Sequence, residues 1–112
     1  VLRIEGPAVE TAIDASSTRP DTYALAQNRP NPFNAQTQIT YRLPETTRIK
    51  LTVYNAQGQP VRRLKNTVEP VGEYAIVWAG KNDRGQALAS GLYFYRLQTE
   101  YGALTRRLVL LK

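Results

Sequence analysis

The chain has 112 residues and a formal net charge of +6, and it contains neither cysteine nor histidine. It therefore has no disulfide framework, no thiolate metal site and no histidine to act as a zinc ligand or general base, which excludes most hydrolase and metalloenzyme mechanisms. No apolar run approaches the roughly 20 residues of a membrane helix, so we expect no membrane span.

The first 22 residues differ from the rest. Residues 1–5 alternate apolar and polar side chains until Gly6-Pro7 interrupts the pattern, so we expect the end of a preceding domain there. Residues 6–22 are rich in Ala, Ser, Thr, Pro and Asp without a sustained period, which predicts a flexible linker. Residues 1–5 lack the charged and apolar regions of a signal peptide, so we expect that they are not one. We interpret the chain as a piece of a longer protein whose C-terminal domain is residues 23–112.

Apolar and polar residues alternate with a period of two in most of the remaining sequence, as in half-buried strands. The segments with this pattern are 37–43, 48–54, 61–64, 73–79, 92–98 and 104–111. The alternation places Trp78 on one face with Tyr74 and Ile76, which favours a core position over an exposed platform for sugars.

Two turns of the same design separate these strands. Asn55-Ala-Gln-Gly58 and Asn82-Asp-Arg-Gly85 begin with asparagine and end with a glycine that can supply a positive φ, as in short hairpin loops. Asn82 and Asp83 could also bind calcium, but one carboxylate makes a poor site for an ion that takes about 6 to 8 oxygen ligands. We therefore expect plain turns and no metal.

Short strands, regular turns and the lack of a helical stretch predict an all-β fold, an immunoglobulin-like antiparallel β-sandwich of about seven strands. Asn31-Pro-Phe-Asn34 precedes the first long strand, and Pro30 and Pro32 restrict the backbone so that Phe33 can close one end of the sandwich. Tyr93 or Tyr95 is expected to be a corner tyrosine that bonds back to the backbone.

Basic residues are concentrated in residues 23–112, where 13 basic and 5 acidic residues give a net charge of +8. Such a charge favours anionic partners, and it also keeps a domain soluble. Arg62, Arg63 and Lys65 lack the interleaved exposed aromatics of single-strand binders, so we expect no nucleic acid. The five carboxylates lie in or beside predicted turns, and their spacing places no pair to flank a substrate, so we expect no catalysis and no cofactor.

Several motifs together carry a resemblance to a known family. In chain order they are Asn31-Pro-Phe-Asn34, Ile39-Thr-Tyr-Arg-Leu-Pro44, Val53-Tyr-Asn-Ala-Gln-Gly58, Val61-Arg-Arg-Leu64, Trp78 followed by Gly80, Asp83 and Gly85, Ser90-Gly-Leu-Tyr-Phe-Tyr-Arg-Leu97, and Arg106-Arg-Leu-Val-Leu-Leu-Lys112. Over roughly residues 23–112 this order resembles the C-terminal sorting domain of type IX secretion substrates, of type A. The immunoglobulin-like domain of flagellar hook-capping proteins is related in fold and shares the strand and turn motifs.

The resemblance implies a non-catalytic module that directs a secreted protein of Bacteroidetes-like bacteria through the periplasm and across the outer membrane to the cell surface. The implied partners are the outer-membrane translocon, a shuttle protein, a sortase-like protease and anionic lipopolysaccharide, and we expect a monomer. Two alternatives stay open, a structural interaction module of the hook-cap kind and a carbohydrate-binding accessory domain of a secreted enzyme.

Two sets of residues follow from the resemblance and the strand pattern. Sorting and recognition are expected at Gly91, Tyr93, Arg106, Arg107, Leu108, Val109, Leu110, Leu111 and Lys112. A structural role is expected for Asn31, Pro32, Phe33, Asn34, Gly58, Trp78 and Gly85. A closing strand at a sheet edge can present backbone donors, a basic pair and apolar side chains together to a receptor, whereas edge arginines and lysines can equally serve only to prevent aggregation.

Overall fold

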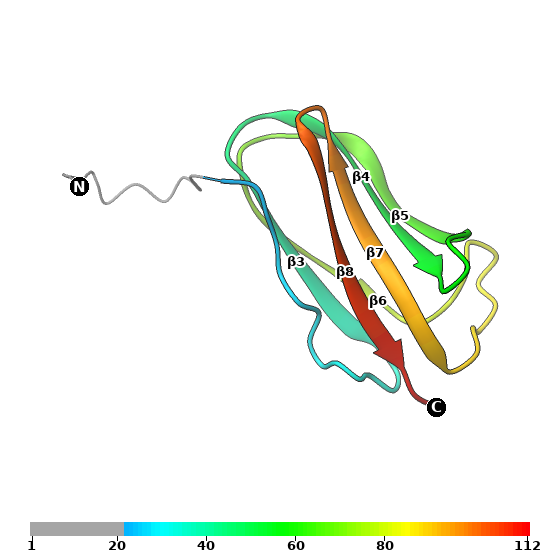
Figure 1. Ribbon diagram of the computed structural model, residues 1–112. Helices are drawn as coiled ribbons and strands as arrows, with labels where there is room; N and C mark the ends of the chain where they lie inside the picture. Colours follow the sequence, from blue (N-terminus) through cyan, green and yellow to red (C-terminus); the bar gives the residue numbers. More distant parts are fainter. Residues whose placement is uncertain (1–21) are drawn as a thin grey trace.

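The computed structural model describes residues 22–112, so the expected domain end at 1–5 and all but the last residue of the expected linker lie outside the described residues. The described chain is all β, with seven antiparallel strands in two sheets that form a sandwich (Figure 1). The strands are β2 (Ala24–Leu25), β3 (Thr37–Leu43), β4 (Thr47–Asn55), β5 (Pro60–Glu69), β6 (Gly72–Trp78), β7 (Gly91–Thr99) and β8 (Gly102–Leu110). The predicted fold class is confirmed.

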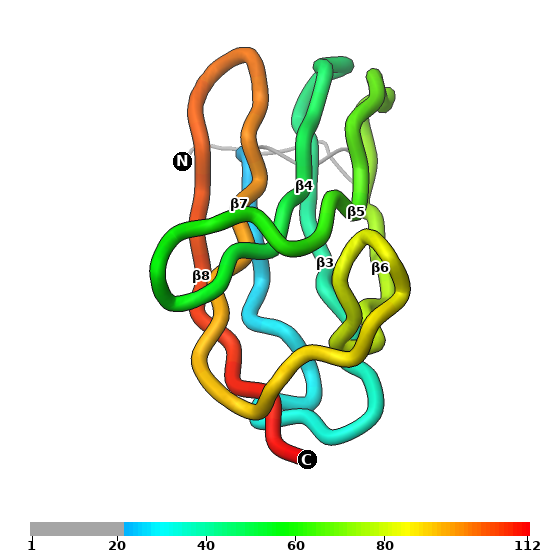
Figure 2. Tube along the Cα trace, turned by 90° about the vertical axis from the view of Figure 1, so that its right-hand side faces the viewer, coloured from blue at the N-terminus to red at the C-terminus, as the bar shows by residue number. Residues whose placement is uncertain are grey.

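The two sheets have the strand orders β2-β3-β6 and β5-β4-β7-β8. Strands β2 and β8 are therefore sheet edges, and they lie next to each other on one side of the sandwich. The loop between β2 and β3 and the last residues of the sequence lie at the same end of the molecule, opposite the hairpin that joins β7 to β8 (Figures 1 and 2). This arrangement brings the Asn31–Asn34 segment to the closing strand.

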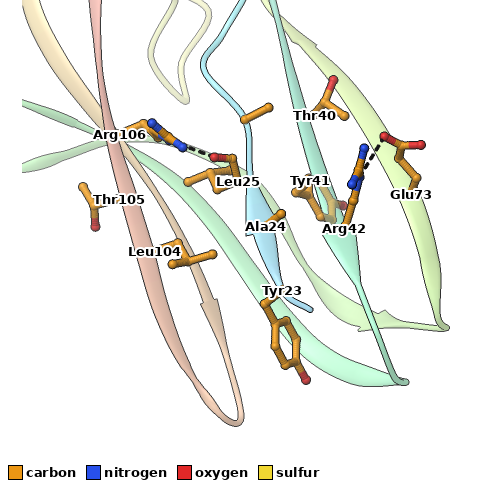
Figure 3. A pocket seen from close by; sticks show the side chains of 11 residues that line it. Tyr23, Ala24, Leu25, Thr40, Tyr41, Arg42, Glu73, Leu104, Thr105 and Arg106 are labelled. Carbon is orange, nitrogen blue, oxygen red and sulfur yellow. Dashed lines mark hydrogen bonds and ion pairs between the residues drawn. The ribbon is translucent and has the colours of Figure 1, made fainter. Parts of the chain in front are cut away.

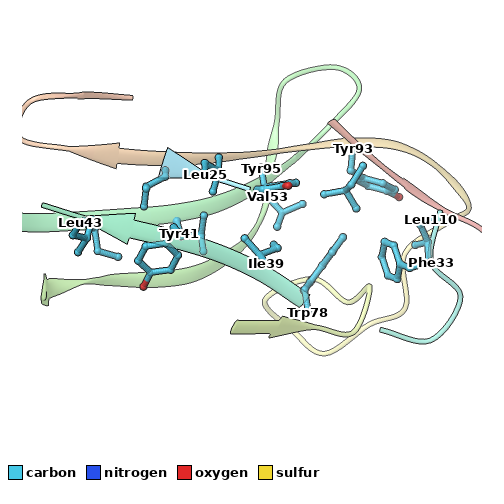
Figure 4. Close-up of a cluster of buried hydrophobic side chains, with 14 residues drawn as sticks. Leu25, Phe33, Ile39, Tyr41, Leu43, Val53, Trp78, Tyr93, Tyr95 and Leu110 are labelled. Atoms are coloured by element: carbon cyan, nitrogen blue, oxygen red, sulfur yellow. The ribbon is translucent and has the colours of Figure 1, made fainter. Parts of the chain in front are cut away.

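The core forms between the inward faces of both sheets, as Figure 4 shows. Its largest fully buried side chains are Trp78, Tyr41, Tyr95, Phe33, Ile39, Leu43, Ile49, Leu51, Leu97, Leu108, Leu110 and Val53. Most of these side chains are buried because every second residue of β3, β4 and β7 faces the other sheet. Each such aliphatic or aromatic side chain stabilises the fold by about 1.5–3 kcal/mol relative to exposure.

Strand β6 behaves differently from the prediction in one respect. Trp78 is buried, as predicted, but Tyr74 and Ile76 are only partly buried and pack against the margin of the core. The reason is that β6 is the outer strand of the three-stranded sheet, so the facing sheet covers its side chains less completely.

The alternation pattern predicted β5 too short and did not predict β2. Strand β5 runs over ten residues where only 61–64 was predicted, and β2 was not predicted at all. Strand β5 is an edge strand with mostly exposed or half-buried residues, and its register shifts opposite Leu51 and Thr52, so its alternation is weak. A strand of two residues is too short to show any period.

The two predicted turns are confirmed. Gly58 and Gly85 have φ values of 84° and 77°, and their amides donate to the carbonyls of Asn55 and Asn82 at 3.0 Å. In each turn the asparagine side-chain oxygen also accepts two backbone N–H bonds, between 2.9 and 3.0 Å. This geometry needs a left-handed residue at the fourth position, which explains the glycines.

Candidate functional site

Of the residues predicted for recognition, Gly91 and Tyr93 lie on β7. Those from Arg106 to Lys112 lie on β8 and just beyond it, and they face different directions. Leu108 and Leu110 point inward and belong to the core. Arg107 lies on the outer face of the four-stranded sheet and is exposed, with Val109 half-buried beside it. Leu111 is 51% exposed and Lys112 is exposed, and these two residues, which we call the tip, extend beyond the end of β8.

The outward edge of β8 is covered over its second half by residues 27–33, which we call the clasp. Phe33 donates its amide to the carbonyl of Val109 at 3.0 Å and accepts from the amide of Leu111 at 2.9 Å. The Val109 amide donates to Oδ1 of Asn31 at 2.9 Å. The expectation that this edge offers free backbone donors to a receptor is therefore wrong for residues 109 and 111, because the clasp already binds them.

The clasp gives a physical role to Asn31-Pro-Phe-Asn34. Phe33 is 1% exposed and forms a parallel bridge with Leu110, so it closes the end of the sandwich as predicted. The peptide bonds before Pro30 and Pro32 are cis. Asn34 is exposed, so within this motif the contacts to β8 come from Asn31 and Phe33.

Two polar residues of the clasp itself, exposed Gln27 and buried Asn28, make contacts that the sequence analysis missed. Asn28 is 1% exposed, and its Nδ2 donates to Oγ1 of Thr37 at 2.9 Å and to the carbonyl of Pro30 at 3.2 Å. Nε2 of Gln27 donates to the carbonyl of Arg107 at 2.6 Å. Polar residues in a loop give no periodic signal, and only their position beside Pro30 and Pro32 hinted at a fixed conformation.

The tip is anchored at its base by the chain that enters β7. The amide of Lys112 donates to Oγ of Ser90 at 2.9 Å, next to Gly91, whose φ is 153°. The predicted recognition residue Gly91 is therefore adjacent to the tip. Tyr93 is not, because its side chain is 7% exposed and packs edge-on against Trp78, with ring centroids 5.9 Å apart.

Both candidate corner tyrosines bond to the backbone. The hydroxyl of Tyr93 donates to the carbonyl of Ala89 at 2.7 Å, a few residues upstream as in a tyrosine corner, and that of Tyr95 donates to the carbonyl of Ala26 at 2.6 Å. Burial raises the pKa of both, that of Tyr95 to about 12. Both phenols stay protonated at neutral pH and act as structural donors.

Arg106 lies at a groove between the two sheet edges, shown in Figure 3. Its Nε donates to the carbonyl of Leu25 at 2.8 Å, which ties β8 to β2. The groove has a volume of about 460 Å³ and is also lined by Tyr23 and by the ion pair of Arg42 and Glu73, 3.2 Å apart. Its one carboxylate is already paired with Arg42 in the structure.

The remaining charged candidates have structural contacts. Oδ1 of Asp83 accepts from the amide of Arg63 at 2.9 Å and pairs with Arg62 at 3.5 Å, so this turn is docked on the edge of β5. Lys65 pairs with Glu69 at 2.9 Å. Within residues 22–112 there is no group of three or more acidic residues that could hold a metal ion, and no helix is long and apolar enough to cross a membrane.

One family model matches the sequence of this domain. The match to the FlgD Ig-like domain covers residues 28–103, from the clasp to the start of β8. The chain belongs to the FlgD Ig-like domain family. No match was found among curated proteins.

Solved structures show the same fold at low sequence identity. FlgD from P. aeruginosa matches with a TM-score of 0.55 and 22% identity over 70% of each chain. Dimeric latent PorU from Porphyromonas gingivalis matches with a TM-score of 0.62 and 16% identity, over 90% of this chain and 10% of PorU. PorZ, a surface component of the type IX secretion system of that organism, matches with a TM-score of 0.51 and 17% identity, over 88% of this chain and 13% of PorZ. This FlgD Ig-like domain thus corresponds in fold to a small part of PorU and PorZ.

Proposed function

We propose that this domain is a non-catalytic sorting and cell-surface attachment module of a protein exported by type IX secretion. The observation that carries the proposal is the similarity in fold to PorU and PorZ. It spans about nine tenths of this chain and about a tenth of PorU and of PorZ. A domain that recurs inside larger proteins of one secretion system is suited to a role that those proteins share. The order of motifs from Asn31 to Lys112 supports the same assignment.

The geometry supports a specific recognition element. The tip, Leu111 and Lys112, leaves the sandwich at the end that the clasp closes, and Arg107 lies nearby on the outer face of β8. A secretion receptor would bind the exposed apolar side chain of the tip together with the basic side chains beside it. The clasp and the core residues Leu108 and Leu110 hold the tip in a fixed position. In this proposal the translocon and a shuttle protein are the first partners, and a sortase-like protease and anionic lipopolysaccharide act afterwards.

A second candidate function is a structural interaction module of the FlgD kind. It is favoured by the family match over residues 28–103 and by the similarity to FlgD. The carbohydrate-binding alternative loses its best platform, because Trp78 is 2% exposed and its indole N–H is bound to the carbonyl of Lys81 at 2.9 Å.

Transplantation tests the proposed function. Residues 1–112 are fused behind a reporter enzyme that carries its own export signal, in a bacterium with type IX secretion, and the reporter on intact cells is measured by antibody labelling. We expect the reporter on the surface with the fusion and in the periplasm without it. A fusion that folds and stays in the periplasm would contradict sorting and favour the structural interaction module.

A further inference from the structure

The outer face of the four-stranded sheet carries five basic side chains. They alternate with the core residues of their strands, so they all point to the same side: Arg63 on β5, Arg48 and Lys50 on β4, Arg96 on β7 and Arg107 on β8. All five are exposed. The residues opposite them in the strand register include Val68, Asn66, Gln98, Thr52 and Thr105, and none of the outward residues of this face is acidic.

The carboxylates of residues 22–112 all bind side chains that are not among these five basic residues, although Asp83 also accepts from the backbone amide of Arg63. Glu69 binds Tyr41 and Lys65, Glu73 pairs with Arg42, Asp83 with Arg62, while Glu45 accepts from Tyr23 and Glu100 from Thr47. Within that range none of the five basic residues of the face has an ion pair. The positive charge of this face is therefore not neutralised by the described part of the domain.

The other face of the sandwich provides the contrast. The outward residues of β3 and β6 include Gln38, Thr40, Ala75 and Val77, and their charged members, Arg42 and Glu73, form an ion pair. Of the two sheet faces, only the four-stranded one therefore carries charge without an ion pair among the described residues, where a general requirement for solubility would place charge on both. A one-sided field steers an oppositely charged partner to that face and raises its association rate.

Apolar and aromatic side chains lie at one end of the same face. Tyr54 is directly opposite Phe94 in the register, and Leu92 is opposite Val109. Leu92 is 39% exposed, and the other three are half-buried. Phe94 is also opposite Arg107, so guanidinium and apolar surface are adjacent.

We propose that this face is a docking surface for an acidic protein surface with an apolar centre. Four of the five charges are arginines, whose planar guanidinium matches carboxylate groups with two parallel hydrogen bonds. Exposed Leu92 and half-buried Phe94, flanked by arginine, have the composition of protein interfaces. Single-stranded nucleic acid stacks its bases on exposed aromatic rings, whereas the rings of Tyr54 and Phe94 on this face are half-buried. The inference goes beyond the proposed sorting function: the face shares only Arg107 with the recognition element, and binding of a peptide to it can be measured without export.

The test uses the 112-residue chain and a synthetic peptide of glutamates flanking two central phenylalanines, long enough to cross four strands, about 15 Å. Binding is measured by backbone amide chemical shifts and by titration at two salt concentrations. We expect shifts on β4, β7 and β8 around Tyr54, Phe94 and Leu92, and weaker binding at high salt. Arg96→Gln combined with Arg107→Gln should weaken binding by about tenfold or more.

Matched variants and probes decide the outcome. Lys81→Gln with Arg84→Gln removes the same number of charges away from this face and should leave the affinity unchanged, as thermal melts confirm that both proteins are folded. Leu92→Ser should weaken the binding of the peptide without altering the binding of single-stranded DNA or of anionic phospholipid vesicles. The proposal is overturned if the peptide changes the chemical shifts of β3 and β6 instead, or if the two double variants weaken peptide binding equally. It is also overturned if the DNA or the vesicles bind as tightly as the peptide.

Discussion

The ring of Phe33 packs against the indole of Trp78, with centroids 5.6 Å apart and planes inclined by 53°. The backbone of Phe33 is bonded on both sides to β8, at Val109 and Leu111. One residue therefore joins the aromatic core to the closing strand. A substitution that loosens the packing of Phe33 on Trp78 should therefore also loosen the hydrogen bond between Phe33 and Leu111 at the tip.

Replacing Trp78 with alanine tests the core assignment. Truncation of a large buried aromatic leaves a cavity and costs about 3–5 kcal/mol of unfolding free energy. Denaturant unfolding followed by circular dichroism measures this loss. A loss below about 1 kcal/mol would place Trp78 at the surface and restore the carbohydrate-binding alternative.

Asn31→Ala tests the clasp, because it removes the acceptor of the Val109 amide. We expect a loss of about 0.5–1.5 kcal/mol and faster hydrogen exchange at Val109 and Leu111. Asn34→Ala, in the same motif but exposed, is the matched control and should change neither quantity. Equal effects of the two substitutions would mean that the asparagine acts through the loop conformation and not through the hydrogen bond to β8.

Tyr95 should make the domain less stable at high pH. The folded-state pKa of Tyr95 is raised by burial to about 12, above the usual value near 10. The raised pKa therefore stabilises the fold fully below pH 10, and this stability is lost as the pH rises towards 12, at up to about 1.4 kcal/mol per pH unit.

Tyr95→Phe checks this linkage in urea melts at several pH values above 9. Burial raises the pKa of Tyr41 in the same direction, so both proteins keep its contribution to the pH dependence. The unfolding free energy of the variant should therefore fall less steeply with pH, by the slope that corresponds to about one proton. An unchanged slope in the variant would show that Tyr95 ionises as readily in the folded protein as in the unfolded chain.

Gly58→Ala and Gly85→Ala test the two turns. Both glycines have a left-handed φ, which costs an L-residue about 1–2 kcal/mol, and no atom lies within 4 Å of an added Cβ, so strain in the backbone should dominate. Each variant should lose about 1 kcal/mol in thermal or denaturant unfolding. Ala56→Ser, at an exposed position inside the first turn, is expected to leave stability unchanged, and a similar loss there would point to the loop sequence as a whole.

The strands that bury one face were predictable because their sequences alternate. Thr37–Leu43 buries Ile39, Tyr41 and Leu43 as predicted, and both turns carry the asparagine and glycine that their geometry requires. Strand β5 was underestimated, since an edge strand buries little and Lys65, Asn66 and Thr67 carry no alternation.

The candidate site was only partly predictable. That Phe33 closes one end could be inferred from the prolines around it, but its partners Val109 and Leu111 are far away in sequence. The pattern also could not show that Val109 and Leu111 are already hydrogen-bonded, because edge coverage is a tertiary property. The basic face became visible only when the register placed Arg63, Arg96 and Arg107 on one surface.

The tip offers the most direct test of the sorting function, because it can be changed without touching the core. Leu111→Ser with Lys112→Ala alters an exposed apolar and basic pair, and Val77→Ser with Lys81→Ala is a matched pair, since Leu111 and Val77 are 51% and 52% exposed. Thermal melts should show that both variants are folded.

The decisive measurement is the fraction of a fused reporter that reaches the cell surface with each pair of substitutions. The proposed function predicts that the reporter accumulates in the periplasm with the tip variant and reaches the surface normally with the matched variant. Normal surface delivery by the folded tip variant would contradict recognition at Leu111 and Lys112.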